Sequence, residues 1–168
     1  DMGRVLYTLW PDDLDGPQPS LDGTPQLQVF NLGVDEVGKP VHPTNEPTMA
    51  GSLYGDTVSY ILAKDDELYV VARSLNSGQE IGAVVGGIPD TAWPQSGASV
   101  VTWLKYGPSA QTYVAWWPHL GQIDEITWEG EATMIDVGEH LLVSDAAQTG
   151  ALNVELLYPR MATSEPEL

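Results

Sequence analysis

An acidic, proline-rich segment near the start of the chain carries the residue types of a cation site. Residues 11–25 hold four aspartates and four prolines, and carboxylates at alternate positions precede Gly16. This spacing resembles a calcium loop, because Ca²⁺ takes about six to eight oxygen ligands. Asp13, Asp15 and Asp22 fit ligand positions of such a loop, but Pro11 stands where the first ligand would be. Calcium binding is therefore one hypothesis for this segment, and a solvated turn is the other.

Six tryptophans are the second group that could bind a ligand. Trp10 and Trp93 each precede a proline in or beside a predicted loop, and Trp103 and Trp117 could pair across a hairpin. Indole rings lying flat on a sheet stack on sugars or other apolar ligands. Successive strand residues point to opposite faces, so one of Trp116 and Trp117 should be core and the other should face solvent or a second layer. The alternative is that these rings simply fill the core.

Groupings suited to catalysis are sparse. Glu129 and Glu131 would share a face of a strand and resemble the carboxylate pair of a glycosidase, but Gly130 between them weakens the strand. The three histidines are far apart in sequence and belong to no metal or protease motif. The sequence also has no P-loop, dinucleotide-binding glycine motif or nucleophile elbow. These observations favour a protein that is not an enzyme, while an unfamiliar enzyme stays open.

The charge balance excludes two classes of partner. The 168 residues include 24 Asp and Glu but only six Lys and Arg, for a net charge of −18. Binding to nucleic acid or to an anionic membrane surface needs cations that this chain lacks. A protein or glycan ligand remains, including a basic protein attracted by the negative field. The absence of cysteine excludes disulfides and thiolate chemistry.

Alternating apolar and polar residues between Gly and Pro breaks predict the elements that position these groups. Residues 57–64 and 67–74 alternate on either side of Asp65-Asp66 and predict a hairpin. Residues 100–106 and 111–117 predict a second hairpin at the heart of a sheet. Residues 33–51 contain three prolines and are expected to be irregular, with one helical turn conceivable around residues 46–53.

The pattern as a whole predicts an all-β fold with little helix. About ten short strands are typical of a two-layer antiparallel β-sandwich of about 8–10 strands, with a partly open β-barrel as the alternative. No repeat of fixed period is visible, and the chain is short for a propeller of usual blade size. The length predicts a single β domain over residues 1–160, followed by a polar tail or linker stub over residues 161–168.

These expectations combine into a non-catalytic extracytoplasmic binding or sensing domain, such as the excised ectodomain of a surface or membrane-tethered protein. Loops on a rigid β scaffold are common places for binding groups. One alternative is a carbohydrate-binding or carbohydrate-active module that uses exposed tryptophans. Another is an acidic inhibitor or immunity-type protein with a basic partner. A secreted, periplasmic or cell-surface location is expected, a cytoplasmic one stays open, and no cofactor other than calcium is indicated.

Overall fold

Strands are the only regular elements in the part of the chain that the computed structural model describes. That part comprises residues 3–9, 24–34, 37–85, 93–106, 110–129, 132–137, 141–146, 151–156 and 158–159. Sheet 1 contains β1 (Arg4–Leu9), β2 (Gln26–Asn31) and β3 (Lys39–Pro40). Sheet 2 contains β4 (Thr48–Tyr54), β5 (Thr57–Lys64), β6 (Glu67–Ser74) and β7 (Glu80–Val85). Sheet 3 contains β8 (Gln95–Ser96), β9 (Val101–Tyr106), β10 (Ala110–Trp117) and β11 (Gln122–Glu129). Sheet 4 contains β12 (Ala132–Val137), β13 (Leu141–Ala146) and β14 (Ala151–Leu156).

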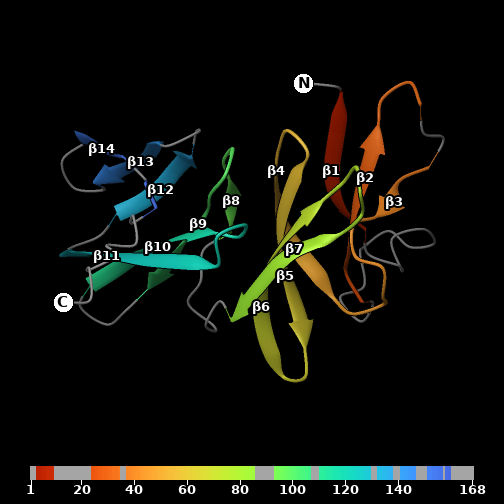
Figure 1. Cartoon of the computed structure of the whole chain (residues 1–168), viewed down its shortest axis with the longest axis horizontal. Helices are drawn as coiled ribbons and strands as arrows, with labels where there is room; N and C mark the ends of the chain where they lie inside the picture. The colour runs from red at the N-terminus through yellow and green to blue at the C-terminus, as the bar shows by residue number, and fades with distance from the viewer. Residues whose placement is uncertain are drawn as a thin grey trace, which may run out of the picture.

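Each sheet is an antiparallel meander of strands that follow one another in the chain. Figure 1 shows the four sheets arranged in chain order, from sheet 1 on the right to sheet 4 on the left. Contacts between β1 and β4, β4 and β8, and β8 and β12 join successive sheets through their first strands. The predicted all-β class with layered antiparallel sheets is confirmed. The arrangement is consistent with a β-sandwich, and none of the described sheets closes into a barrel. The described residues form 14 strands in four consecutive meanders, more than the 8–10 strands expected from the sequence.

The hairpin of β5 and β6 follows directly from its turn residues. Lys64 pairs with Glu67, which leaves Asp65 and Asp66 as a two-residue loop. Both aspartates have positive φ, 53° and 63°, as a type I′ turn requires. Aspartate tolerates this left-handed conformation better than most residues. The predicted hairpin is confirmed at the predicted place.

The hairpin of β9 and β10 is also confirmed, but its tryptophans pair differently from the prediction. Trp103 lies opposite Val114, and Val101 lies opposite Trp116. Trp103 and Trp116 therefore share a face and meet edge to face, with ring centroids 6.4 Å apart. Trp117 points to the other face, so the expected pairing of Trp103 with Trp117 is wrong.

Strand β4 replaces the irregular segment and the helical turn that were considered for this region. It pairs with β5, and the register shifts between Met49 and Ser52. Ala50 has a φ of 53° within this bulge. Gly51 lies so close to sheet 1 that a Cβ atom there would collide with the side chain of Leu27. The bulge interrupts the period-two pattern, which explains why alternation did not reveal the strand.

Two hydrophobic cores bury both faces of sheet 2. The first packs sheet 2 against sheet 1 and contains Leu27, Val29, Val41, Val58, Tyr60, Leu62 and Val71. The second packs sheet 2 against sheet 3 and contains Val70, Ala72, Val101, Trp103, Val114 and Trp116. All five residues from Val58 to Leu62 are consequently buried. Ser59 is satisfied in this setting by the Ser96 hydroxyl, 2.7 Å away.

Candidate anion-binding cleft

A cleft of about 390 Å³ opens where sheet 1 meets the turn between β6 and β7. Its polar and charged lining comes from four separate elements or their ends, and its apolar lining from β2, the segment around β3 and the β6–β7 turn. The polar and charged residues are Arg4, Asn31, Lys39, Arg73, Ser74 and Asn76. The remaining lining residues are Val29, Pro40, Val41, Pro43, Leu75 and Gly78.

The charge of this lining is opposite to that of the chain. Arg4, Lys39 and Arg73 are three of the six Lys and Arg residues of the sequence, and they converge on one cleft. None of the described lining residues is acidic, although the sequence contains 24 Asp and Glu. Like charges gathered in a concave site focus the local potential and raise the concentration of an oppositely charged ligand. The cleft is therefore suited to hold an anion.

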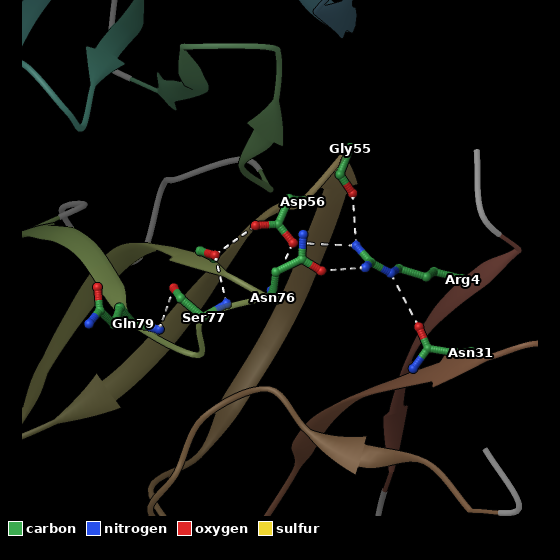
Figure 2. Close-up of polar contacts among 8 residues, drawn as sticks. Arg4, Asn31, Gly55, Asp56, Asn76, Ser77 and Gln79 are labelled. Atoms are coloured by element: carbon green, nitrogen blue, oxygen red, sulfur yellow. Dashed lines mark hydrogen bonds and ion pairs between the residues drawn. The ribbon is translucent and has the colours of Figure 1, made fainter. Parts of the chain in front are cut away.

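Arg4 fixes one side of the cleft by joining its own strand to three other elements, as Figure 2 shows. Its Nε donates to Asn31 Oδ1 at 3.2 Å, and its Nη2 donates to Asn76 Oδ1 at 2.9 Å. Its Nη1 donates to the Gly55 carbonyl at 3.2 Å and lies 3.5 Å from Asp56 Oδ1. The side chain is only 13% exposed. Arg4 thus connects β1 and β2 to the β4–β5 turn and the β6–β7 turn.

The β6–β7 turn is held by hydrogen bonds among its own residues and by hydrogen bonds that it donates to Asp56. Asp56 Oδ2 accepts from Ser74 Oγ at 2.6 Å, and Asp56 Oδ1 accepts from the Asn76 backbone N–H at 2.8 Å (Figure 2). The Ser77 N–H donates to Ser74 Oγ at 3.2 Å. Local side-chain to backbone bonds of this kind stabilise turns. The cleft wall that carries Ser74 and Asn76 is therefore preorganised.

Arg73 lies on the same wall, at the end of β6, and is close to two further titratable groups, His42 and Tyr60. Its Nη2 donates to the Gly78 carbonyl. Nearby, His42 Nδ1 lies 2.8 Å from the Tyr60 hydroxyl, and His42 Nε2 lies 3.4 Å from Glu46 Oε2. Burial lowers the pKa of His42 against the opposing effect of Glu46, and burial raises the pKa of Tyr60 to about 12. Tyr60 stays protonated at neutral pH, so the wall offers positive charge but no activated phenolate.

The tryptophans that the sequence suggested as ligand-binding residues differ in their exposure to solvent. Trp93 is 69% exposed, whereas Trp103 and Trp117 are 1% and 2% exposed and lie in the core. Trp10 lies outside the described residues. Trp103 and Trp117 therefore do not form an exposed aromatic surface with Trp93. Trp116 and Trp117 are both 2% exposed, so neither of the two faces solvent, which leaves the alternative that one is core and the other faces a second layer.

The predicted calcium ligands Asp13, Asp15 and Asp22 also lie outside the described residues, as does Glu131 of the carboxylate pair. Within the part of the chain that the structure describes, no three His, Asp or Glu side chains are grouped as metal ligands. The same described part contains no helix long and apolar enough to cross a membrane.

Sequence reasoning missed the cationic cleft. Arg4, Lys39 and Arg73 are far apart in the chain and form no motif. The sequence signal that could have pointed to the cleft is the scarcity of Lys and Arg. With only six such residues in an acidic chain, a site that binds an anion must draw on them. Their convergence depends on how sheet 1 packs against sheet 2, which the alternation pattern does not report.

Comparison with solved structures gives distant likenesses, among them a BamB structure and a designed protein. No protein-family model matches the chain, and no curated protein matches it. The crystal structure of BamB from Moraxella catarrhalis is 16% identical, with a TM-score of 0.46, and the alignment covers 77% of this chain. The chain spans 37% of that BamB structure. The computationally designed Ika4 protein is 13% identical, with a TM-score of 0.32, over 70% of this chain and 95% of Ika4. Likenesses of this size assign neither a family nor a role to this chain.

Proposed function

We propose that this chain is a non-catalytic binding domain, acting outside the cytoplasm, that holds an anionic group of its ligand in the cleft of Arg4, Lys39 and Arg73. The observation that carries the proposal is that half of the Lys and Arg residues line one cleft and that none of its described lining residues is acidic. Arg4 is paired with Asp56 behind the lining, so Arg73 and Lys39 are the residues proposed to contact the anion. Charge-assisted hydrogen bonds from arginine to a carboxylate or phosphate are among the stronger polar contacts in proteins.

The groups beside the cleft favour binding over catalysis. Tyr60 is fully buried with a pKa of about 12, and the His42 ring is occupied by contacts to Tyr60 and Glu46. A general base must reach the proton that it removes. These residues fix the wall around Arg73 instead of facing a reacting group.

The net charge of −18 limits which anions are favoured. A polyanion extends beyond the cleft into a negative field, whereas a single carboxylate or phosphate group meets mainly the local cations. At physiological ionic strength charges are screened over about 8 Å, so nearby contacts persist while the distant repulsion weakens. The proposed ligand therefore presents one compact anionic group.

Titration of the ¹⁵N-labelled full chain with acetate and with inorganic phosphate tests the proposal. We expect saturable amide shifts around Lys39, Arg73 and Gly78. Arg73→Gln and Lys39→Gln should each weaken binding by about tenfold or more, because contacts to charged groups contribute about 1.5–3 kcal/mol. The matched control is Lys105→Gln, since Lys105 pairs with Glu125 at 2.7 Å in sheet 3, away from the cleft. Shifts that do not saturate, or that are identical in all variants, would contradict the proposal.

The extracytoplasmic location is a separate part of the proposal. It is supported by the proline-rich loops on a β scaffold and is checked by fractionation of cells that express the natural gene. Recovery in the cytoplasmic fraction would remove this part and leave the cleft unaffected.

A glycan ligand is the second candidate function, and the 69% exposure of Trp93 is the observation that favours it. Soluble glycans should then quench tryptophan fluorescence, and Trp93→Ala should abolish the quenching. Quenching that persists in that variant would exclude Trp93 as the stacking surface.

A further inference from the structure

One side of the cleft is apolar, which the anion-binding proposal does not use. Val29 and Val41 line it from the core between sheets 1 and 2 and are only 8% and 4% exposed. The lining residues that offer accessible apolar surface are Pro40, Pro43 and Leu75. Removing apolar surface from water favours binding in proportion to the area covered. A ligand that fits this cleft therefore carries an apolar group next to its anionic group.

The cleft has an exposed rim. Lys39 and Pro40 of β3 are exposed, and so are Asn76 and Gly78 of the β6–β7 turn. A small-molecule site usually covers most of its ligand's surface, whereas the exposed rim of this cleft leaves part of a bound ligand uncovered. An extended chain can instead cross an open cleft and continue beyond it.

From this combination we infer that the ligand is an extended protein segment in which an acidic side chain lies next to an apolar one. This inference rests on the proposed function, because it assigns the ligand class of the same cleft. The acidic side chain would be held by Arg73 and Lys39, and the apolar side chain by Leu75, Pro43 and Pro40.

Charge favours a protein segment over a lipid headgroup, which offers the same combination of anion and apolar chain. An anionic bilayer is an extended negative surface, and it attracts clusters of cations. A chain with a net charge of −18 is repelled by such a surface. A segment with one or two carboxylates avoids most of this repulsion.

Three blocked peptides separate the contributions of charge and apolar contact. They are the N-acetyl, C-amide forms of Gly-Leu-Asp-Leu-Gly, Gly-Ser-Asp-Ser-Gly and Gly-Leu-Asn-Leu-Gly. Affinity is measured by calorimetry, and the site by ¹⁵N amide shifts of the full chain. We expect the first peptide to bind at the cleft and each of the other two to bind about tenfold more weakly. A tenfold change in affinity corresponds to about 1.4 kcal/mol of binding free energy.

Variants of the two walls complete the test. Arg73→Gln should weaken the first peptide about tenfold, and Lys39→Gln, at an exposed position, provides the same test if the first variant does not fold. Pro43→Ser should weaken binding of the Gly-Leu-Asp-Leu-Gly peptide by a larger factor than it weakens binding of the Gly-Ser-Asp-Ser-Gly peptide. Lys105→Gln should change neither the binding of the peptides nor the binding of inorganic phosphate.

The outcomes distinguish this inference from the proposed function. Equal binding of the leucine and serine aspartate peptides, with phosphate still bound, would overturn the inference and leave the anion site standing. If neither of the two aspartate peptides binds and inorganic phosphate does not bind, both the inference and the proposed function are overturned. Sedimentation of the full chain with phosphatidylserine vesicles, reduced in Arg73→Gln, would replace the protein segment by a membrane and overturn the inference.

Discussion

Replacing Arg4 by glutamine should weaken the attachment of sheet 1 to sheet 2. The substitution removes hydrogen bonds to Asn31, Gly55 and Asn76 and the ion pair with Asp56. Hydrogen bonds to charged groups contribute about 1.5–3 kcal/mol each when they are well buried. Two of the three bonds are exposed, so water partly replaces them. We expect Arg4→Gln to lower the free energy of unfolding by about 2 kcal/mol.

A double-mutant cycle with Asp56→Asn isolates the ion pair within this network. The Arg4 Nη1 to Asp56 Oδ1 distance is 3.5 Å, and the Asp56 side chain is 36% exposed. Such pairs contribute about 0.2–1 kcal/mol, so the coupling energy should be about 0.5 kcal/mol. Asp56→Asn alone should cost more than this coupling, because Asp56 also accepts from Ser74 Oγ and the Asn76 N–H.

Urea unfolding of the full chain, followed by tryptophan fluorescence, measures these values. The slope of the unfolding free energy against urea should stay constant across the variants, because the exposed area on unfolding is unchanged. Lys105→Gln is the control, since its ion pair is 38% and 52% exposed and should change stability by less than about 1 kcal/mol. A loss below about 0.5 kcal/mol for Arg4→Gln would refute the reasoning that this network joins the sheets.

Three further predictions concern the turns, the close sheet contact and pH. Asp66→Gly should stabilise the chain by about 0.5–1 kcal/mol in urea unfolding, because glycine suits the positive φ of 63° at the second turn position; a destabilised variant would contradict the type I′ turn. Gly51→Ala should lower the unfolding free energy by about 1–3 kcal/mol, because the added Cβ would collide with the buried side chain of Leu27, and unchanged stability would show that this side chain can shift without cost. Burial lowers the pKa of His42, against Glu46, so the unfolded chain binds the proton more readily. The stability that this difference contributes is present above the usual histidine pKa of about 6.5 and is lost as the pH falls below it. The loss of stability between pH 7 and 5 should therefore be smaller in His42→Gln than in the parent chain, and identical pH profiles would exclude a role for this residue.

Much of the local structure could be read from the sequence. Alternation together with Asp65-Asp66 predicted the β5–β6 hairpin, and the apolar runs around the Gly-Pro break predicted the β9–β10 hairpin. These features depend on neighbouring residues alone, because turn conformation and side-chain alternation are properties of a short segment. Strand β4 was missed because its bulge and the preceding prolines interrupt that alternation.

The candidate site could not be read in the same way. The tryptophans stood out by their size and chemistry, yet Trp103 and Trp117 are buried while Trp93 is exposed. A period-two pattern shows which residues share a face of a strand, but not whether another sheet covers that face. Sheet 2 illustrates this, since Ser59 and Ile61 face a second core opposite Val58 and Tyr60.

By itself, the sequence determined the all-β class, the principal turns, the shortage of cations and the negative charge of the chain. Only the tertiary structure decided that Arg4, Lys39 and Arg73 meet beside an apolar wall, and that sheet 2 is covered on both sides. Local segments encode strands and turns because those depend on nearby backbone and side-chain geometry. The convergence of distant cations depends on the order and packing of whole sheets, which is set by the summed burial of many side chains.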